Sequence, residues 1–265
     1  MMDPTEQSLQ RTRIRCSVVE RYYYQFIPPF EQSVFPVFQR LSDGTSRLAS
    51  TGFFIAPSGF FLSAAHVFEI DVGETDSFWM IHVDSSGQIH ELDLDGVSIR
   101  PEGRDIALGK VKMGELDHPI VSIMELLPEV NEVMASFAFS HTLIHEPEDQ
   151  DGELTQLVQY RSHWELGKVE EVSHEGFWKI PGPSFRSSIL VEGRASGSPV
   201  FNSNGFVVGV NCRGMAPEDD RPYSVASSIN GIMDLKVDGI NIRERREGLR
   251  NKPIAAVYKN VQNAR

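Results

Sequence analysis

The most informative segment of the chain reads TGFFIAPSGFFLSAAHVF and runs from Thr51 to Phe68. It holds two apolar, aromatic-rich runs separated by Pro57-Ser58-Gly59, and a Pro/Gly turn between two such runs predicts a β-hairpin. The second run ends in Ser-Ala-Ala-His, where small residues allow the backbone to turn tightly and direct the ring of His66 into a cleft. The segment therefore predicts paired strands that end at an imidazole.

Short strands of the same kind are predicted along most of the chain. Further β-branched and aromatic runs, each bounded by Gly, Asp, Asn or Pro, are SVFPVFQRL, SFWMIHVDS, IHELDLDGVSI, DIALGKVKM, MASFAFS, SSILVEG, SPVFNSNGFVVGVNCRG and YSVASSI. Many short runs separated by turn signals indicate antiparallel sheets or barrels, not alternating strands and helices. The loop Asn202–Gly205 should be a second tight hairpin.

Composition narrows the class of protein. The chain has 265 residues, of which 40% are hydrophobic and 23% charged, as in an ordinary globular protein with one large or two small β domains. Its two cysteines, Cys16 and Cys212, exclude a disulfide framework, and we expect both to be reduced. A formal net charge of −12 makes nucleic acid a poor candidate partner.

Location is predicted from two missing patterns. Charged residues interrupt the first twenty positions, so they do not match a secretory signal peptide. No run approaches about 18 consecutive apolar residues, so the sequence predicts no membrane span. We therefore expect a cytoplasmic protein that does not bind membranes.

Three short blocks carry the residues needed to hydrolyse an amide. A serine hydroxyl needs a histidine base beside it and a carboxylate that holds the histidine in the right tautomer. SAAHVF supplies His66, DIAL supplies Asp105 at the head of an apolar strand, and RASGSPVF supplies Ser196 on a turn of small residues. Each of the three also has a purely structural interpretation, as a packed histidine, a turn aspartate and a turn serine.

These blocks, in the order His, Asp, Ser, resemble the signature blocks of trypsin-like (chymotrypsin-fold) serine peptidases, especially their disulfide-poor bacterial branch. The resemblance extends from about residue 33 to 230. It implies an all-β fold of two antiparallel six-stranded β-barrels packed with the active site between them. It also implies that His66, Asp105 and Ser196 form a catalytic triad. An α/β-hydrolase would instead carry its serine in a GxSxG elbow, which this chain lacks.

The expected organisation has five parts. Pro119 and Pro128 interrupt any long strand between the two halves, so we place a crossing connection there. The segment SSINGIMDLKV, which begins at Ser227, could form a short C-terminal helix. The predicted parts are an N-terminal extension (1–32), a first β-barrel (33–118), the connection (119–132), a second β-barrel (133–232) and a C-terminal tail (233–265).

The resemblance also suggests residues that bind the substrate. The backbone N–H groups of Ser196 and Arg194 would form the oxyanion hole, although Arg194 stands where the family usually has glycine. A bulky residue there opposes the required backbone conformation, which raises the possibility of a latent hole. Ala195 replaces the aspartate that receives a new N-terminus in digestive enzymes, so activation by propeptide cleavage is not expected. The primary specificity pocket would be lined by Ile189, Leu190, Asn211, Cys212, Arg213 and Gly214.

The preferred interpretation is therefore a serine endopeptidase that acts through an acyl-enzyme on protein or peptide substrates, without a cofactor and under the control of a partner protein. One alternative is a latent or inactive trypsin-like module that binds peptides or proteins, and another is an esterase on the same scaffold.

Charged residues near the expected cleft leave the substrate preference open. Arg213 would favour acidic substrates or merely face solvent, and the acidic run Glu218–Asp220 would favour basic substrates or form a solvated loop. His141 and His145 have HxxxH spacing but lack the glutamate of a zinc motif, so no metal is expected.

Overall fold

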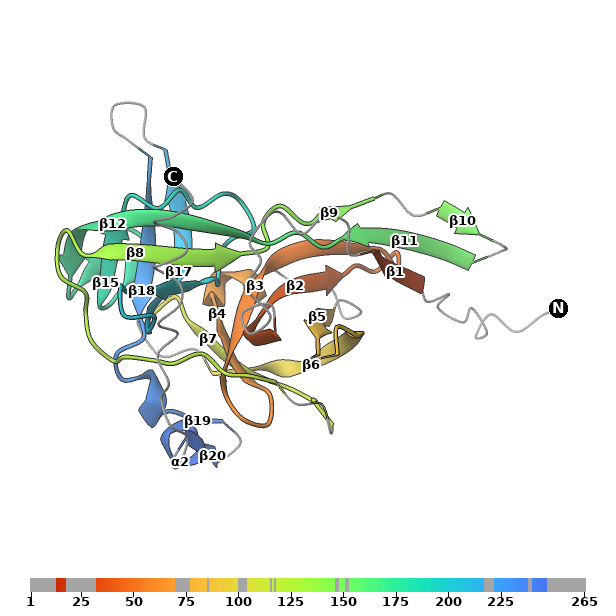
Figure 1. Ribbon diagram of the computed structural model, residues 1–265, viewed down its shortest axis with the longest axis horizontal. Coiled ribbons are helices and arrows are strands. Elements are labelled where there is room, and N and C mark those ends of the chain that lie inside the picture. Colours follow the sequence, from red (N-terminus) through yellow and green to blue (C-terminus); the bar gives the residue numbers. More distant parts are fainter. Residues whose placement is uncertain are drawn as a thin grey trace.

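The computed structural model describes residues 13–17, 32–69, 77–84, 86–99, 104–114, 116, 118–145, 148–150, 153–216, 222–237 and 240–246. These residues form two closed antiparallel barrels of six strands, with the first barrel in orange and yellow and the second in green to blue (Figure 1). The predicted all-β fold with two six-stranded barrels is confirmed. No helix in this described part of the chain is long and apolar enough to span a membrane.

The first barrel has the strand order β2-β3-β4-β7-β6-β5. Its strands are β2 (Val34–Arg40), β3 (Ser46–Ala56), β4 (Phe60–Ser63), β5 (Ser77–Val83), β6 (Ile89–Ile99) and β7 (Ala107–Val111). The predicted hairpin joins β3 to β4, and its turn residues Ser58 and Gly59 have φ angles of 68° and 81°. Two consecutive positive φ angles match the right-handed twist of the flanking strands, which explains the tight reversal.

The second barrel has the order β12-β15-β18-β17-β16-β8. Its strands are β8 (Val133–Ala138), β12 (His163–Ser173), β15 (Ser184–Ser187), β16 (Pro199–Phe201), β17 (Val207–Met215) and β18 (Tyr223–Ser228). The loop Asn202–Gly205 joins β16 to β17 as predicted, and the side chain of Asn202 accepts hydrogen bonds from the main-chain N–H groups of Asn204 and Phe206, both at 3.1 Å. An asparagine that bonds its own loop in this way stabilises the turn.

Successive side chains of β3 and β4 belong to two different hydrophobic clusters. Phe54 and Phe61 belong to a cluster made only of residues from the first barrel and its immediate C-terminal continuation. Phe53 and Phe60 belong to a second cluster, which also contains residues of the second barrel such as Phe137. Because successive side chains of a strand point to opposite faces, the hairpin packs its own barrel with one face and the other barrel with the opposite face.

The connection between the barrels is held by main-chain contacts. Val121 donates its N–H to the carbonyl oxygen of Phe54 in the first barrel at 3.0 Å, and Ile123 forms a parallel bridge with Val207 of the second. The prolines of this segment are therefore compatible with an extended path across both barrels.

Smaller elements lie outside the barrels. β1 (Arg13–Ser17) pairs in parallel with β11 (Glu153–Gln159), which also pairs with β10 (Glu148–Gln150) and β9 (Leu143–Ile144). The rest of the predicted N-terminal extension, up to residue 31, lies outside the described residues. β13 (Gly176–Phe177) and β14 (Ile180–Pro181) form a hairpin, as do β19 (Lys236–Val237) and β20 (Ile240–Asn241).

The C-terminal helix is short, as predicted, but its position differs from the predicted one. The helical part of SSINGIMDLKV is limited to the 3₁₀ turn η2 (Ile232–Asp234), and the α-helix α2 (Ile242–Arg246) lies in the charged segment that follows. The side-chain oxygen of Asn241 accepts the N–H of Arg243 at 2.8 Å, and such a cap favours the start of a helix. The guanidinium of Arg243 also binds Asp234 and Glu125, both at 2.8 Å.

Candidate active site

His66 lies where the first barrel turns away from β4. It belongs to the 3₁₀ turn η1 (Ala65–Phe68), in which Ala65, Val67 and Phe68 are buried. The main-chain N–H of His66 donates to Asp105 Oδ1 at 2.9 Å. Because its buried neighbours anchor the turn, the ring of His66 is held with its side chain 34% exposed at the surface of the barrel.

Asp105 lies just before β7 and binds His66 a second time. Its Oδ2 is 2.7 Å from His66 Nδ1, and its side chain is only 12% exposed. Burial alone would raise the pKa of Asp105, but the hydrogen bonds and charge of His66 outweigh it, so the pKa lies below its ordinary value. An ionised carboxylate only accepts hydrogen bonds, so Nδ1 of a neutral His66 carries the proton and Nε2 is left as an acceptor.

Ser196 lies on a turn that is inserted against the first barrel. Its carbonyl oxygen accepts the N–H of Thr51 on β3 at 2.9 Å. The next residue, Gly197, has a φ of 85°, and a Cβ added there would lie 2.1 Å from the carbonyl oxygen of Thr51 and 2.2 Å from Ser63 Oγ. Only glycine fits this close approach, so Gly197 allows the serine turn to reach the barrel that carries His66.

Cys212 links the serine to the aspartate. Ser196 Oγ donates to the carbonyl oxygen of Cys212 at 3.0 Å, and Cys212 Sγ donates to the carbonyl oxygen of Asp105 at 3.3 Å. The thiol is free and fully buried, and burial raises its pKa well above its ordinary value. In this conformation, among the described residues, the hydroxyl of Ser196 is hydrogen-bonded to Cys212 and not to His66.

Asn211 supports the same strand from inside the second barrel. Its Nδ2 donates to Ser136 Oγ at 2.7 Å and to Ser198 Oγ at 2.9 Å, and the residue is fully buried. The main-chain oxygen of Asn211 also accepts the N–H of Gly197 at 2.7 Å. Asn211 was predicted to line the pocket, and in the structure its side chain ties the turn of Ser196 to the barrel.

The predicted oxyanion turn has a strained backbone. Ala195 donates its N–H to the carbonyl oxygen of Glu192 at 3.2 Å, which closes a four-residue turn, and Arg194 within it has a φ of 77°. Glycine adopts this conformation without strain, whereas for other residues a positive φ is energetically unfavourable. Arg194 therefore adopts a positive φ despite its bulky side chain.

Two histidines border this turn. His141 Nε2 lies 2.9 Å from a carboxylate oxygen of Glu192, and the ring of His141 stacks on that of His163 at 4.0 Å between centroids. Burial lowers the pKa of His163 to about 4, and the charge of His141 acts in the same direction. His141 therefore contacts the oxyanion turn, a role that its HxxxH spacing did not indicate.

The predicted specificity residues divide into two groups. Ile189, Asn211 and Cys212 are fully buried, so their side chains do not reach the surface. Leu190 is 52% exposed, and Arg213 and Gly214 also reach the surface. A Cβ added to Gly214 would lie 2.2 Å from the carbonyl oxygen of Val191, so the two segments that carry the predicted pocket residues approach each other closely at this point.

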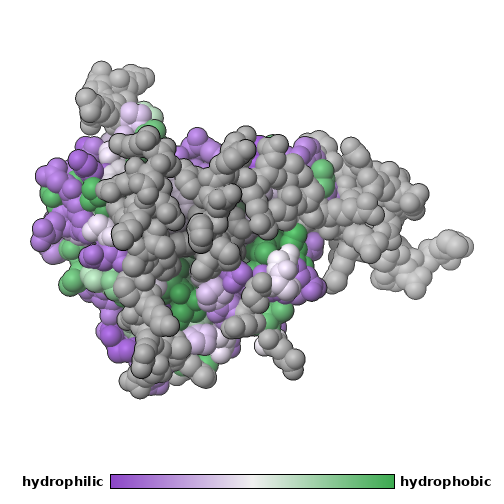
Figure 2. Space-filling view, in the orientation of Figure 1, coloured by the Kyte–Doolittle hydropathy of each residue, from purple (hydrophilic) through white to green (hydrophobic). Residues whose placement is uncertain are grey.

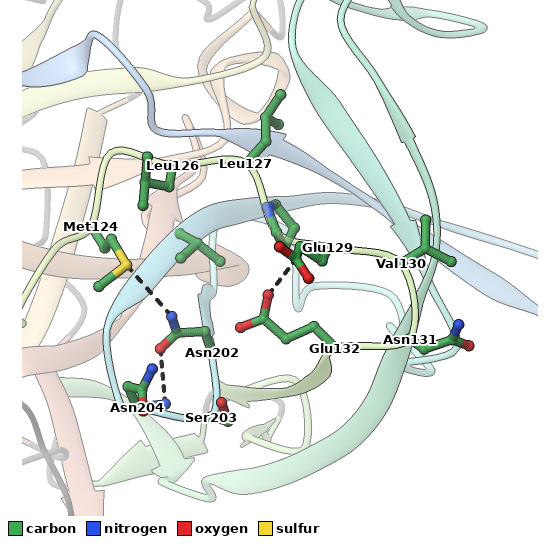
Figure 3. A pocket seen from close by; sticks show the side chains of 12 residues that line it. Met124, Leu126, Leu127, Glu129, Val130, Asn131, Glu132, Asn202, Ser203 and Asn204 are labelled. Atoms are coloured by element: carbon green, nitrogen blue, oxygen red, sulfur yellow. Dashed lines mark hydrogen bonds between the residues drawn. The ribbon is translucent and has the colours of Figure 1, made fainter.

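A cavity of about 550 Å³ opens elsewhere, on the connection between the barrels (Figure 3). It lies between residues 124–132 and the hairpin loop Asn202–Asn204, where Asn202 Nδ2 is 3.8 Å from Met124 Sδ. None of the predicted catalytic residues lines it.

The sequence and the fold are similar to those of known proteins. A family model described as a trypsin-like peptidase domain matches residues 50–210. No protein of curated function matches the chain by sequence.

Solved structures share its fold at low identity. The chain is similar to Deg5 (TM-score 0.58, 16% identity, 77% of this chain and 87% of that one) and to the MamO protease domain from Magnetospirillum magneticum (0.54, 13%, 77% and 96%). It is also similar to the active form of the Rv3671c protease from M. tuberculosis (0.51, 17%, 76% and 78%).

Proposed function

The chain belongs to the family of trypsin-like peptidase domains and is a serine protease, and we propose that it is an endopeptidase whose catalytic triad is Ser196, His66 and Asp105. The observation that carries this proposal is the double hydrogen bond between His66 and Asp105, at 2.9 and 2.7 Å. It orients the base, while Cys212 connects Asp105 to the hydroxyl of Ser196.

The mechanism proceeds through an acyl-enzyme. The hydrogen bond from Ser196 Oγ to the carbonyl oxygen of Cys212 first breaks. Ser196 Oγ then attacks the scissile carbonyl carbon and transfers its proton to His66 Nε2. Asp105 remains ionised and stabilises the imidazolium, which then protonates the leaving amine. The N–H groups of Ser196 and Arg194 stabilise the oxyanion, and water activated by His66 releases the acyl group. These steps need no cofactor.

The substrate is a protein or peptide, and its main chain pairs with β17. The main chain of Asn211 bonds Gly197 and Ser198, and β16 pairs with β17 only from Val207 to Val210. Among the described strands, the residues from Arg213 to Met215 therefore have β18 alone as a partner. An extended peptide that adds to such a free edge gains main-chain hydrogen bonds close to Ser196.

A second candidate is a latent form that first binds a peptide or a partner protein. It is favoured by the hydrogen bond from Ser196 to Cys212 and by the close approach of Gly214 to Val191. In that case a substrate or a regulatory protein separates the two segments and frees the serine hydroxyl. The free, buried thiol of Cys212 supports an intracellular location, where thiols stay reduced.

The test is labelling of the purified protein with a fluorophosphonate probe, followed over time. We expect covalent labelling that is lost in Ser196→Ala and retained in Ser203→Ala, a matched change at an exposed serine of the β16–β17 loop. Labelling that starts only after a peptide is added would support the latent form. Labelling that persists in Ser196→Ala would overturn the assignment of the nucleophile.

A further inference from the structure

The hairpin of β13 and β14 places a tryptophan in an unusual position. The two strands pair Gly176 with Pro181 and Phe177 with Ile180, so Trp178 and Lys179 form the two-residue loop. Trp178 has a φ of 47° and is 70% exposed. Glycine is the residue preferred at such a position, and a bulky side chain there is both strained and denied the benefit of burial. Strain of this kind points to a functional constraint.

This hairpin is anchored next to the proposed nucleophile. Ile180 is buried in a small cluster with Cys212 and Val225, and Phe177 packs against the same cluster. Cys212 is the residue whose carbonyl oxygen accepts the hydroxyl of Ser196. The exposed loop therefore belongs to a hairpin that packs against β17 at the residue that bonds Ser196.

Two cations meet at the ring of Trp178. Lys179 Nζ lies 4.8 Å and Arg213 Cζ 5.3 Å from the ring centroid, and Arg213 directly follows Cys212 on β17. An aromatic face attracts a cation, so the ring can hold both groups in place.

These cations lack carboxylate partners within the described part of the chain. Arg186 on β15 also lies over an aromatic ring, but it binds Glu170 at 3.3 Å and Glu171 at 3.9 Å. Arg213 and Lys179 form no ion pair among the described residues. The chain has 37 acidic and 25 basic residues, so two unpaired neighbouring cations stand out against its overall charge. A carboxylate of a bound ligand would supply the ion pair that Arg213 and Lys179 lack among the described residues.

We propose that Trp178, Lys179 and Arg213 form a subsite that binds an acidic side chain of the peptide substrate. The inference rests on the proposed peptidase function and adds the chemical class of the substrate. Arg213 supplies the charge and hydrogen-bond donors, Lys179 adds charge, and the ring of Trp178 packs against the methylene groups of the bound residue. A peptide antiparallel to β17 places residues that precede the scissile bond at this subsite.

The first experiment measures binding without turnover. Peptides with glutamate or glutamine scanned over the four positions before a cleavage site are titrated against Ser196→Ala, with tryptophan fluorescence and anisotropy as readouts. At one of these positions we expect glutamate to bind about fivefold more tightly, as for a surface ion pair. The preference should disappear in Ser196→Ala/Arg213→Gln. It should persist in Ser196→Ala/Lys110→Gln, because Lys110 makes a similar contact with Phe60 in the first barrel.

The second experiment measures kcat/KM on the same peptides and uses charge reversal. Arg213→Glu should lose the preference for glutamate and prefer lysine at that position. A glutamate preference that survives Arg213→Gln, or a lysine preference in the unaltered protein, overturns the inference. The latter would favour the acidic run Glu218–Asp220, which lies outside the described residues. Normal binding of acidic peptides without any labelling would instead contradict the proposed function.

Discussion

At the scale of single residues, two residues near the proposed site adopt states that are unfavourable on their own. Arg194 has a left-handed φ, and His163 is mostly buried without the proton that a histidine takes up readily in water. Such features cost stability and persist only when surrounding contacts enforce them. Arg194 lies in the turn that leads to Ser196, and His163 stacks on His141, which contacts Glu192 of the same turn.

Changes at Arg194 should separate backbone conformation from side-chain function. Arg194→Gly keeps the positive φ without strain, so the rate of fluorophosphonate labelling should remain within about threefold of the original. Arg194→Val should lower that rate at least about tenfold, because a β-branched residue is strongly disfavoured at positive φ. Circular dichroism of each variant checks that the fold is kept. Equal rates for glycine and valine would show that the turn does not need this conformation.

His163 should make stability depend on pH. Its pKa is about 4 in the folded protein and about 6.5 when unfolded, so between these values the unfolded chain binds more protons. Its contribution is therefore fully present above about pH 6.5 and is lost as the pH falls toward 4. As the pH falls from about 6.5 to 4, the urea midpoint of His163→Asn should rise relative to that of the unaltered protein, because the variant lacks the histidine whose protonation favours unfolding. A trend of the same size in Ser203→Ala, at an exposed position without a titrating group, would contradict this assignment.

At the scale of elements, close contacts between strands and turns bring the two halves of the site together. The turn of Ser196 touches β3 through Thr51, and Cys212 of β17 touches Asp105, just before β7. This arrangement requires a glycine at position 197, because a side chain there would push the serine turn away from β3.

Gly197→Ala should therefore be severely destabilising. Its Cβ would collide with main-chain and side-chain oxygens of the first barrel, and its φ is positive, so we expect a loss of more than about 3 kcal/mol in the free energy of unfolding. Gly193→Ala is the matched control, because no atom lies within 4 Å of its Cβ. Chemical denaturation measures both. Similar stabilities for the two variants would mean that the serine turn does not press on the first barrel.

At the scale of the whole molecule, a single hydrophobic cluster joins the barrels. It contains Phe53 and Ile55 from the first barrel and Phe137 and Phe201 from the second. The described surface in Figure 2 is mainly hydrophilic over the second barrel, with small separate hydrophobic patches. The large apolar side chains are therefore concentrated between and inside the barrels, which favours cooperative unfolding.

Phe139→Ala should destabilise both barrels together. Its ring lies 4.6 Å from that of Tyr160 and 5.5 Å from that of Phe137, and its N–H donates to Thr51 Oγ1 in the first barrel at 3.3 Å. A loss of about 3–5 kcal/mol is expected for truncating a buried phenylalanine. Calorimetry should show one transition at a lower temperature, whereas Leu126→Ala, at a side chain 61% exposed, should change little. Two separate transitions would contradict the shared core.

Local pattern was enough to predict much of this protein. Strands, hairpin turns and the barrel class follow from the period-two alternation and from the Gly, Pro and Asn that end each run, because these properties depend on neighbouring residues. The short blocks also identified His66, Asp105 and Ser196 as candidates. The position of the C-terminal helix was missed because one side-chain cap at Asn241 decides it.

Folding in three dimensions decided the state of the site and its surroundings. The hydrogen bond from Ser196 to Cys212, the contact of Gly214 with Val191, and the meeting of Trp178 with Arg213 all join residues that are distant along the chain. Such contacts depend on how the strands close into barrels and how their turns approach one another. No local sequence pattern encodes that geometry, because it arises from packing between elements and not from the propensity of any one of them.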